Sequence, residues 1–383
     1  MRISLVSWFI FSLYIATFFS ISALSVSGQC QSHQQQLLLG FKNSLNSSLS
    51  EKLAKWNQGT DCCSWDGITC DTSGRVIGLH LSSESISGEI NNSNSLFRLQ
   101  HLQELSLADN KQLGGQLPES IVNLGQLTSG TVPPALFQSE SLKAMHLAEN
   151  QFSGGFGEVK GELSSRLQFP MFVFEIQGLE ILSLSWNKFS GVIALSAFQK
   201  LQNLTTLDLS YNNLSVDSSF TNLPLPLLPP FPNNLSGSIP QCLMTLMRES
   251  LVVLNLKQNN LSGIISDTFA ENCTLQTHYL HQNRLGGKVP KSLANCRMLE
   301  VLELGNNYID DTFPCHLNNH LAGQIPLQLA DLNFLSFLNL SNNELTGRIP
   351  LGTQIQSFSE ASFGNNAGLC GRPLEVVMIL LLK

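Results

Sequence analysis

One phrase recurs along the chain at a nearly constant step, and it constrains the fold more than any other feature. The phrase is Leu-x-x-Leu-x-Leu-x-x-Asn, and three successive copies end at Asn259, Asn283 and Asn307, each 24 residues from the next. In the second copy His278 replaces one leucine. A repeat of this length predicts a solenoid built from stacked coils rather than a closed globule.

Each copy predicts one short strand that turns into the next coil. Leu254 and Leu256 alternate with Val253 and Asn255, so one face of the strand points inward and the other points outward. A single coil cannot bury its own leucines, but stacked coils join their strands into a parallel sheet with a continuous core. The asparagine amide is expected to bond backbone groups that the turn leaves unpaired.

A second phrase, Leu-x-Gly-x-Ile-Pro, follows the asparagine, as in residues 345–350. Glycine permits unusual backbone angles, and proline holds the following segment extended. The pair of phrases resembles the plant-specific leucine-rich repeat, in which the second phrase forms a strand on the side of the solenoid. This resemblance implies an α/β-type repeat solenoid with a parallel sheet on the concave face. It further implies irregular or 3-10 segments on the convex face and a cysteine-capped N-terminus.

Five segments are expected. Residues 1–28 resemble a signal peptide, because Arg2 precedes an apolar run and small residues end it. Residues 29–74 resemble the N-terminal cap of plant leucine-rich-repeat receptors, which covers the first coil's core. Repeats fill residues 75–350, a C-terminal cap fills 351–374, and a short apolar tail fills 375–383. The tail is shorter than the roughly 20 residues that span a bilayer, so the chain as written is expected to be extracellular or defective.

Nine cysteines fit an oxidising compartment. The spacing of Cys30, Cys62, Cys63 and Cys70 alone allows three pairings, and a zinc site is the competing interpretation. The cap resemblance implies Cys30–Cys62 and Cys63–Cys70.

The other five cysteines are less constrained. We expect Cys273 and Cys296, one coil apart, to be two buried free thiols. We expect Cys370 to be unpaired, because the second cysteine of the family's C-terminal cap is missing. The pairing of Cys242 and Cys315 is left open.

Eight Asn-x-Ser/Thr sequons are candidate glycosylation sites in a secreted chain. They begin at Asn46, Asn91, Asn203, Asn213, Asn234, Asn260, Asn272 and Asn339. Asn339 falls inside a predicted strand, so we do not expect every sequon to be used.

The repeat register breaks at several points. Interruptions are expected near residues 127–135, 155–178, 217–235 and 313–326. Prolines crowd residues 224–232, and proline cannot donate to a sheet ladder, so an interrupted sheet is predicted there. These gaps motivate the hypothesis that the chain is a shortened or mis-spliced version of a longer receptor.

Composition and motifs argue against two classes of function. The net charge is −7 and only 13% of residues are charged, which disfavours a nucleic-acid binder. Residues 155–161 resemble a kinase glycine-rich loop, but the downstream kinase motifs do not follow. The sequence therefore predicts no enzyme, no cofactor, no metal and no catalytic residue.

The outward positions of the strands are the expected binding surface. Seven residues on this surface are candidate ligand contacts: Trp186, Asp208, Tyr211, Lys257, Tyr279, His281 and Glu303. Aromatic residues among small polar ones are typical of protein contacts, although they are also compatible with ordinary solvated strands.

Taken together, the caps and repeats resemble plant receptor-like proteins of the disease-resistance type, which lack a kinase. The resemblance implies an extracellular protein or peptide ligand, partner co-receptor kinases and the plasma membrane. The alternatives are a secreted inhibitor of cell-wall-degrading enzymes and a non-functional receptor fragment.

Overall fold

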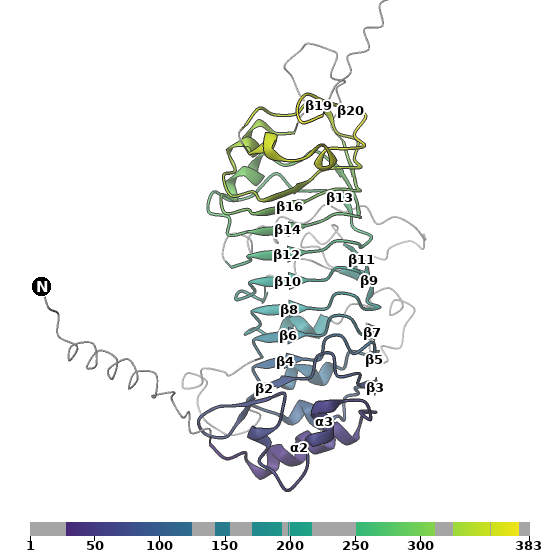
Figure 1. Ribbon diagram of the computed structural model, residues 1–383, viewed down its shortest axis with the longest axis vertical. Helices are drawn as coiled ribbons and strands as arrows, with labels where there is room; N and C mark the ends of the chain where they lie inside the picture. Colours follow the sequence, from purple (N-terminus) through teal and green to yellow (C-terminus); the bar gives the residue numbers. More distant parts are fainter. Residues whose placement is uncertain are drawn as a thin grey trace, which may run out of the picture.

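The computed structural model describes residues 28–124, 142–153, 171–193, 198, 200–216, 250–310, 325–352 and 354–374. Its coils follow one another along the long axis of the molecule (Figure 1). Ten strands form one sheet in the order β1-β2-β4-β6-β8-β10-β12-β14-β16-β18. Their bounds are Ile68–Cys70, Val76–His80, Glu104–Ser106, Ala144–His146, Ile181–Ser183, Thr206–Asp208, Val253–Asn255, Thr277–Tyr279, Val301–Glu303 and Phe337–Asn339.

The middle residue of each of these repeat strands points into one shared core. From β4 onward these residues are Leu105, Met145, Leu182, Leu207, Leu254, His278, Leu302 and Leu338, all buried. Apart from the antiparallel pair β1–β2, every neighbouring pair in this sheet is parallel. The predicted solenoid with a parallel sheet is therefore confirmed.

The second phrase forms short strands beside the main sheet, as expected. They are β3 (Ser87–Glu89), β5 (Gln112–Gln116), β7 (Gln151–Ser153), β9 (Ser190–Ile193), β11 (Asn213–Val216), β13 (Ser262–Ile264), β15 (Arg284–Gly287), β17 (Tyr308–Ile309), β19 (Thr346–Arg348) and β20 (Gly368–Cys370). They pair in parallel within four small sheets.

Short 3-10 helices return the chain toward the next strand. They are η2 (Ser95–Arg98), η3 (Glu119–Asn123), η5 (Met171–Glu175), η7 (Lys291–Asn295) and η8 (Leu327–Asp331). Two more, η9 (Ile355–Ser357) and η10 (Glu360–Ser362), precede β20.

A ladder of asparagine side chains connects successive coils. Asn307 is representative: its Nδ2 donates to the carbonyl of Leu304 in its own coil (2.9 Å) and to that of Leu280 in the preceding coil (3.1 Å). Its Oδ1 accepts from the backbone N–H of Leu285 (3.0 Å). The ladder members are Asn110, Asn150, Asn187, Asn212, Asn259, Asn283, Asn307, Asn343 and Asn366. Asn366, in the C-terminal cap, was not expected among them.

The main sheet continues across the gap where an interruption was predicted. Strand β10 pairs directly with β12 in register, with Thr206 opposite Val253. The expectation of an interrupted sheet near residues 217–235 was therefore wrong for the sheet itself. The sheet has a leucine phrase on each side of this gap. Because the entropic cost of closing a loop grows only slowly with loop length, two such strands can pair although many residues separate them in the sequence. Residues 217–249 themselves lie outside the described residues.

The N-terminal cap closes one end of the core. It contains α2 (Ser32–Asn43), α3 (Glu51–Lys55) and the 3-10 helix η1 (Cys62–Ser64). Helices α2 and α3 lie at one end of the stack (Figure 1). Trp56 stacks on Trp65 with ring centroids 5.1 Å apart, and Leu38 and Phe41 are fully buried. These side chains cover the leucines of the first coil, as a solenoid end requires.

The structure joins Cys30 to Cys62 and Cys63 to Cys70, the two pairs that the cap resemblance implies. It also joins Cys273 to Cys296, with Cα atoms 4.6 Å apart, so the expectation of two free thiols was wrong. Leu275 and Leu299 differ by one place in their distance from these cysteines, but the turns before the strands absorb that residue. In the second coil the Leu299 N–H closes a turn on the carbonyl of Cys296 (2.9 Å), which accommodates the additional residue before the strand.

Cys370 is also disulfide-bonded, which corrects the expectation that it is unpaired. A disulfide depends on the distance between two backbones and not on their order in the chain. A cysteine near the last coil therefore does not need a partner further along the sequence.

Several predictions concern segments outside the described residues. The signal segment up to residue 27, the tail at 375–383, and most of the other three expected interruptions belong to this group. Among the residues that the structure describes, no helix is long and apolar enough to cross a membrane.

The ladder predicts that the same substitution has a large effect at one of two adjacent asparagines and almost none at the other. Asn307→Gly removes four hydrogen bonds, and unpaired buried backbone groups cost about 1–3 kcal/mol each to desolvate, so we expect a loss of about 3 kcal/mol. Asn306 is exposed and has a φ of 54°, which glycine adopts readily, so Asn306→Gly is expected to leave stability nearly unchanged. Urea unfolding measures both. Equal losses would contradict the role given to the ladder.

His278 predicts a pH-dependent loss of stability. Complete burial lowers its pKa from 6.5 to about 4, and neither ring nitrogen has a hydrogen-bond partner among the described residues. The unfolded chain, with a pKa near 6.5, therefore binds the proton more readily between these values. The stabilising contribution is complete above pH 6.5 and is lost as the pH falls toward 4, by about 3 kcal/mol. His278→Leu should remove this part of the decline. A variant whose unfolding free energy falls as steeply as the wild type's would refute the assignment.

Candidate ligand-binding surface

The outward side chains of the main sheet form a grid of rows that cross the strands. One row contains Asp208, Asn255, Tyr279 and Glu303, which lie opposite one another on β10, β12, β14 and β16. Lys257 and His281 come two residues after Asn255 and Tyr279, so they lie in the next row. The repeat therefore brings residues distant in sequence to neighbouring places on one face.

A further row marks the edge where the strands end. Each ladder asparagine is preceded by a residue with positive φ, between 50° and 56°. We call these residues the rim row: Asp109, Glu149, Trp186, Tyr211, Gln258, Gln282, Asn306, Asn342 and Asn365. L-residues other than glycine seldom adopt this conformation, and it costs each about 1–2 kcal/mol. The bonds of the neighbouring asparagine hold the turn in place.

Trp186 and Tyr211 therefore lie at the rim rather than on the strands where the sequence placed them. Their rings stack with centroids 3.8 Å apart and an interplanar angle of 16°. Trp186 is 54% exposed, whereas Tyr211 is half-buried. The pair offers an indole surface of the kind that anchors protein contacts.

Lys257 lies between two tyrosines. Its Nζ is 5.4 Å from the ring centroid of Tyr211 and 5.1 Å from that of Tyr279, within the range of cation–π attraction. Trp186, Tyr211, Lys257 and Tyr279 thus form one continuous group over four coils, which we call the aromatic–lysine cluster.

His281 and Glu303 extend this cluster toward the C-terminus. The His281 Nδ1 and a Glu303 carboxylate oxygen are in contact, and both side chains are largely buried. Burial, with a smaller contribution from the Glu303 carboxylate, raises the pKa of Tyr279. At neutral pH Tyr279 therefore stays uncharged beside the lysine.

Asp208 lies on the same face but is engaged locally. Its Oδ1 accepts from the N–H of Ser210 (3.0 Å) and from the Ser210 hydroxyl (2.7 Å). The structure therefore groups six of the seven candidate residues side by side and gives Asp208 a turn-forming role next to them.

Sequence reasoning missed polar residues in the N-terminal coils. The His80 Nε2 lies 3.6 Å from a Glu104 carboxylate oxygen, and burial lowers the pKa of His146 on the same face. His146 stands four places before Asn150, as Tyr279 does before Asn283, so reading the same position in every coil would have found it. Phe337, 45% exposed on β18, stands six places before Asn343, so reading that position in every coil would have found it as well.

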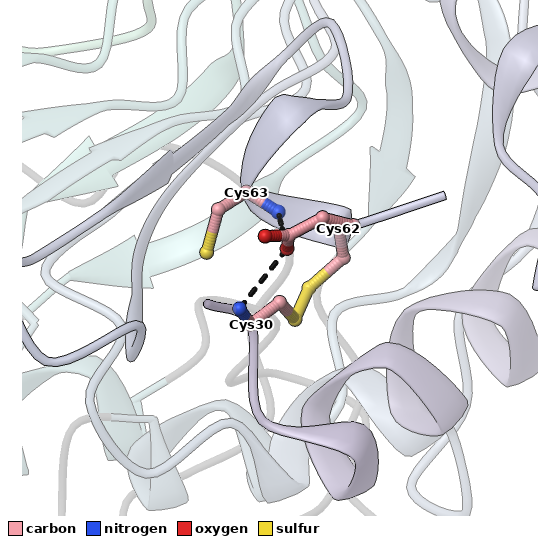
Figure 2. Close-up of side chains that lie close together, drawn as sticks. Cys30, Cys62 and Cys63 are labelled. Carbon is pink, nitrogen blue, oxygen red and sulfur yellow. Dashed lines mark hydrogen bonds between the residues drawn. A yellow bond between two sulfur atoms is a disulfide. The ribbon is translucent and has the colours of Figure 1, made fainter. Parts of the chain in front are cut away.

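The cysteines of the cap do not form a thiolate metal site. Cys30, Asp61, Cys62 and Cys63 place ligand-type atoms within 4.8 Å of one another. Figure 2 shows the disulfide of Cys30 with Cys62, and Cys63 is bonded to Cys70. Disulfide sulfurs cannot act as thiolate ligands. The Asp61 carboxylate instead accepts the backbone N–H groups of Cys30 and Cys63, both at 3.0 Å.

The sequons differ in accessibility. Five of them start at exposed asparagines: Asn46, Asn91, Asn203, Asn213 and Asn272. Asn260 is half-buried, and Asn339 lies in β18 with its Oδ1 bonded to the N–H and hydroxyl of Ser341. Asn234 falls outside the described residues. Glycan attachment remains a prediction at all eight.

Two family models match the chain. The model described as "Leucine rich repeat N-terminal domain" matches residues 31–71, the segment folded as the cap. The model described as "Leucine Rich Repeat" matches residues 203–223, 250–272 and 334–354.

Curated relatives include receptor-like proteins of Arabidopsis thaliana. Receptor-like protein 6 is 27% identical over 76% of this chain, which corresponds to 29% of that protein. Receptor-like protein 47 is 45% identical over 26% of this chain and 13% of that protein. The chain thus spans less than a third of the length of these relatives.

Solved structures with the same fold include a plant ice-binding protein, with a TM-score of 0.62 and 26% identity over 90% of this chain and 97% of that one. The ectodomain of the receptor kinase GASSHO1/SCHENGEN3 from Arabidopsis thaliana, in complex with CASPARIAN STRIP INTEGRITY FACTOR 2, has a TM-score of 0.60 and 27% identity, covering 83% and 30%. The PEPR1–AtPEP1 structure has a TM-score of 0.51 and 25% identity, covering 88% and 45%. The matches confirm the resemblance to plant leucine-rich-repeat receptor-like proteins.

The geometry of the cluster predicts how Tyr279 ionises. Glu303→Gln removes a negative charge that disfavours the phenolate, so the pKa of Tyr279 should fall while burial still holds it above its usual value. Ultraviolet titration measures this, with Tyr279→Phe identifying the signal. An unchanged midpoint in Glu303→Gln would show that the carboxylate does not act on the ring.

Proposed function

Because the chain is a plant-type leucine-rich-repeat protein that resembles receptor-like proteins, we propose that it is an extracellular recognition module. It binds a protein or peptide signal, of pathogen or endogenous origin, through the concave face of its main sheet. The aromatic–lysine cluster with His281 and Glu303 is the principal contact area, and Asp208 lies at its border. No catalytic step is part of this function.

The single observation that supports this proposal most is the continuity of the aromatic–lysine cluster. Trp186 is exposed although most large apolar side chains of the described coils are buried in the core. An exposed tryptophan, two tyrosines and a lysine on one face match the residue types that dominate binding energy at protein interfaces. The coils also hold this surface rigid, which lowers the entropy lost on binding.

Similarity of fold alone does not determine the function, because this chain is also similar in fold to a plant ice-binding protein. Two similar structures with lower TM-scores carry named partners in their complexes, CASPARIAN STRIP INTEGRITY FACTOR 2 and AtPEP1. These partners support a peptide or protein ligand here. The other parts of the proposal rest on the resemblance to receptor-like proteins. They are a location at the plasma membrane, signalling through partner kinases and a role in defence.

Selection from a displayed random-peptide library tests the binding function without a known ligand. Peptides enriched on the wild-type chain should bind a Trp186→Ala, Tyr211→Ala, Tyr279→Ala triple variant at least about tenfold more weakly, because these side chains supply the aromatic surface of the cluster. Biolayer interferometry of the selected peptides measures the ratio.

A matched triple variant controls for the loss of apolar surface in general. Leu49, Leu327 and Leu351 are exposed by 76%, 64% and 65%, and none lies on the main sheet. Alanine at these positions should leave peptide binding unchanged. Equal binding by wild type and the aromatic triple variant would reject the concave surface. If the wild-type chain and both triple variants all inhibit a fungal polygalacturonase, the result would instead support the alternative of a secreted enzyme inhibitor.

A further inference from the structure

Lys257 carries a positive charge that no carboxylate among the described residues neutralises. By contrast, five other lysines each pair with a carboxylate: Lys52, Lys55, Lys111, Lys143 and Lys200. Lys257 is half-buried, and its ammonium group contacts two tyrosine rings instead of an acid. Two rings remove part of its hydration, and partial desolvation strengthens the attraction between an ammonium group and an anion.

Glu303 supplies the opposite charge on the same face. Its Oε2 contacts the His281 Nδ1, and its other carboxylate oxygen has no hydrogen-bond or ion-pair partner among the described residues. Tyr279 lies between the two charges, in register with Glu303 on the neighbouring strand. The surface therefore presents an ammonium group, a neutral ring and a carboxylate in that order.

The stacking of the coils sets the distances between these groups. Trp186 follows β8, Lys257 follows β12 and Glu303 belongs to β16, so two strand spacings separate each from the next. Neighbouring strands lie about 4.8 Å apart, which gives steps of about 10 Å across the sheet. Lys257 also lies two residues, about 7 Å, further along the strand direction than Glu303, an offset within reach of a long ligand side chain. An extended peptide advances about 3.3 Å per residue, so three residues span each step.

We propose that the ligand is an extended peptide that crosses the strands with an aromatic residue at Trp186, an acidic residue at Lys257 and a basic residue at Glu303. Successive anchor residues are three positions apart. The indole of Trp186 stacks on the aromatic side chain, Lys257 pairs with the acid, and Glu303 pairs with the base. This inference rests on the proposed peptide-binding function and adds the charge pattern of the ligand.

Charge complementarity favours a peptide over a carbohydrate at this position. A neutral oligosaccharide would offer neither an anion to Lys257 nor a cation to Glu303, and an oligogalacturonide would offer carboxylates to Lys257 but no cation to Glu303. Only a chain with both signs at fixed spacing satisfies the two groups together, and unpaired charges at an interface are penalised.

Synthetic peptides test the pattern directly. The probes are acetylated, amidated heptapeptides with the order Trp-Ala-Ala-Asp-Ala-Ala-Arg and its reverse, since the direction of the chain is not specified. The controls exchange Asp and Arg and keep the composition. One probe direction should bind the wild-type chain at least about tenfold more tightly than its control, measured by calorimetry. Equal binding of probe and control, or binding of neither, overturns the inference.

A charge-exchange variant makes the test independent of the peptides' general affinity. Lys257→Glu with Glu303→Lys should reverse the preference, so that the control peptide binds more tightly than the probe. Lys143→Glu with Glu180→Lys exchanges an exposed surface pair, 3.7 Å apart, and should leave the wild-type preference intact. An unreversed preference in the first variant overturns the inference.

The two proposals fail in distinguishable ways. If library peptides require Trp186, Tyr211 and Tyr279 but show neither charge at these spacings, the recognition function stands and the charge pattern fails. If oligogalacturonides bind and Glu303→Gln leaves their affinity unchanged, the ligand is a carbohydrate and the peptide is excluded.

Discussion

The hydrogen bonds of the asparagine ladder hold successive coils at a constant spacing, and the rest of the structure depends on that spacing. Each amide donates to carbonyls in two coils and accepts a backbone N–H of the earlier coil. For Asn150 this N–H belongs to the preceding ladder member, Asn110. An amide can make these bonds in both directions at once, whereas a hydroxyl or carboxylate cannot offer the same donors and acceptors. Six of the nine members are buried, where unpaired backbone groups are most costly.

The ladder also determines where recognition residues can lie. Its turn forces the preceding residue into the left-handed region, and that residue then stands at the edge of the concave face. The core places few constraints on the identity of this residue, because its side chain is exposed at six of the nine rim-row positions. Different residues can therefore be placed along one rigid edge at strand spacing. Trp186, Tyr211 and Gln258 show this variety within three coils.

Much of this could be predicted from the sequence, because the repeat phrase is local and each of its positions has one structural role. The strand leucines, eight ladder asparagines, the flanking strands and six clustered surface residues follow from position in the phrase. Three expectations were wrong, namely the free thiols of Cys273 and Cys296, the unpaired Cys370 and the interrupted sheet. The Cys273–Cys296 bond depends on how a turn absorbs one residue, and the β10–β12 pairing joins strands that residues 217–249 separate in the sequence.

Amide hydrogen exchange on the whole chain tests the central claim, a single ladder that joins every coil. The account predicts slow exchange at the N–H groups that ladder asparagines accept from, including Leu214 and Leu261 on the two sides of residues 217–249. Protection at these amides should be lost together as denaturant rises, because each coil stabilises the next. Fast exchange at Leu214 with slow exchange at Leu261 would show two separate stacks and contradict the account.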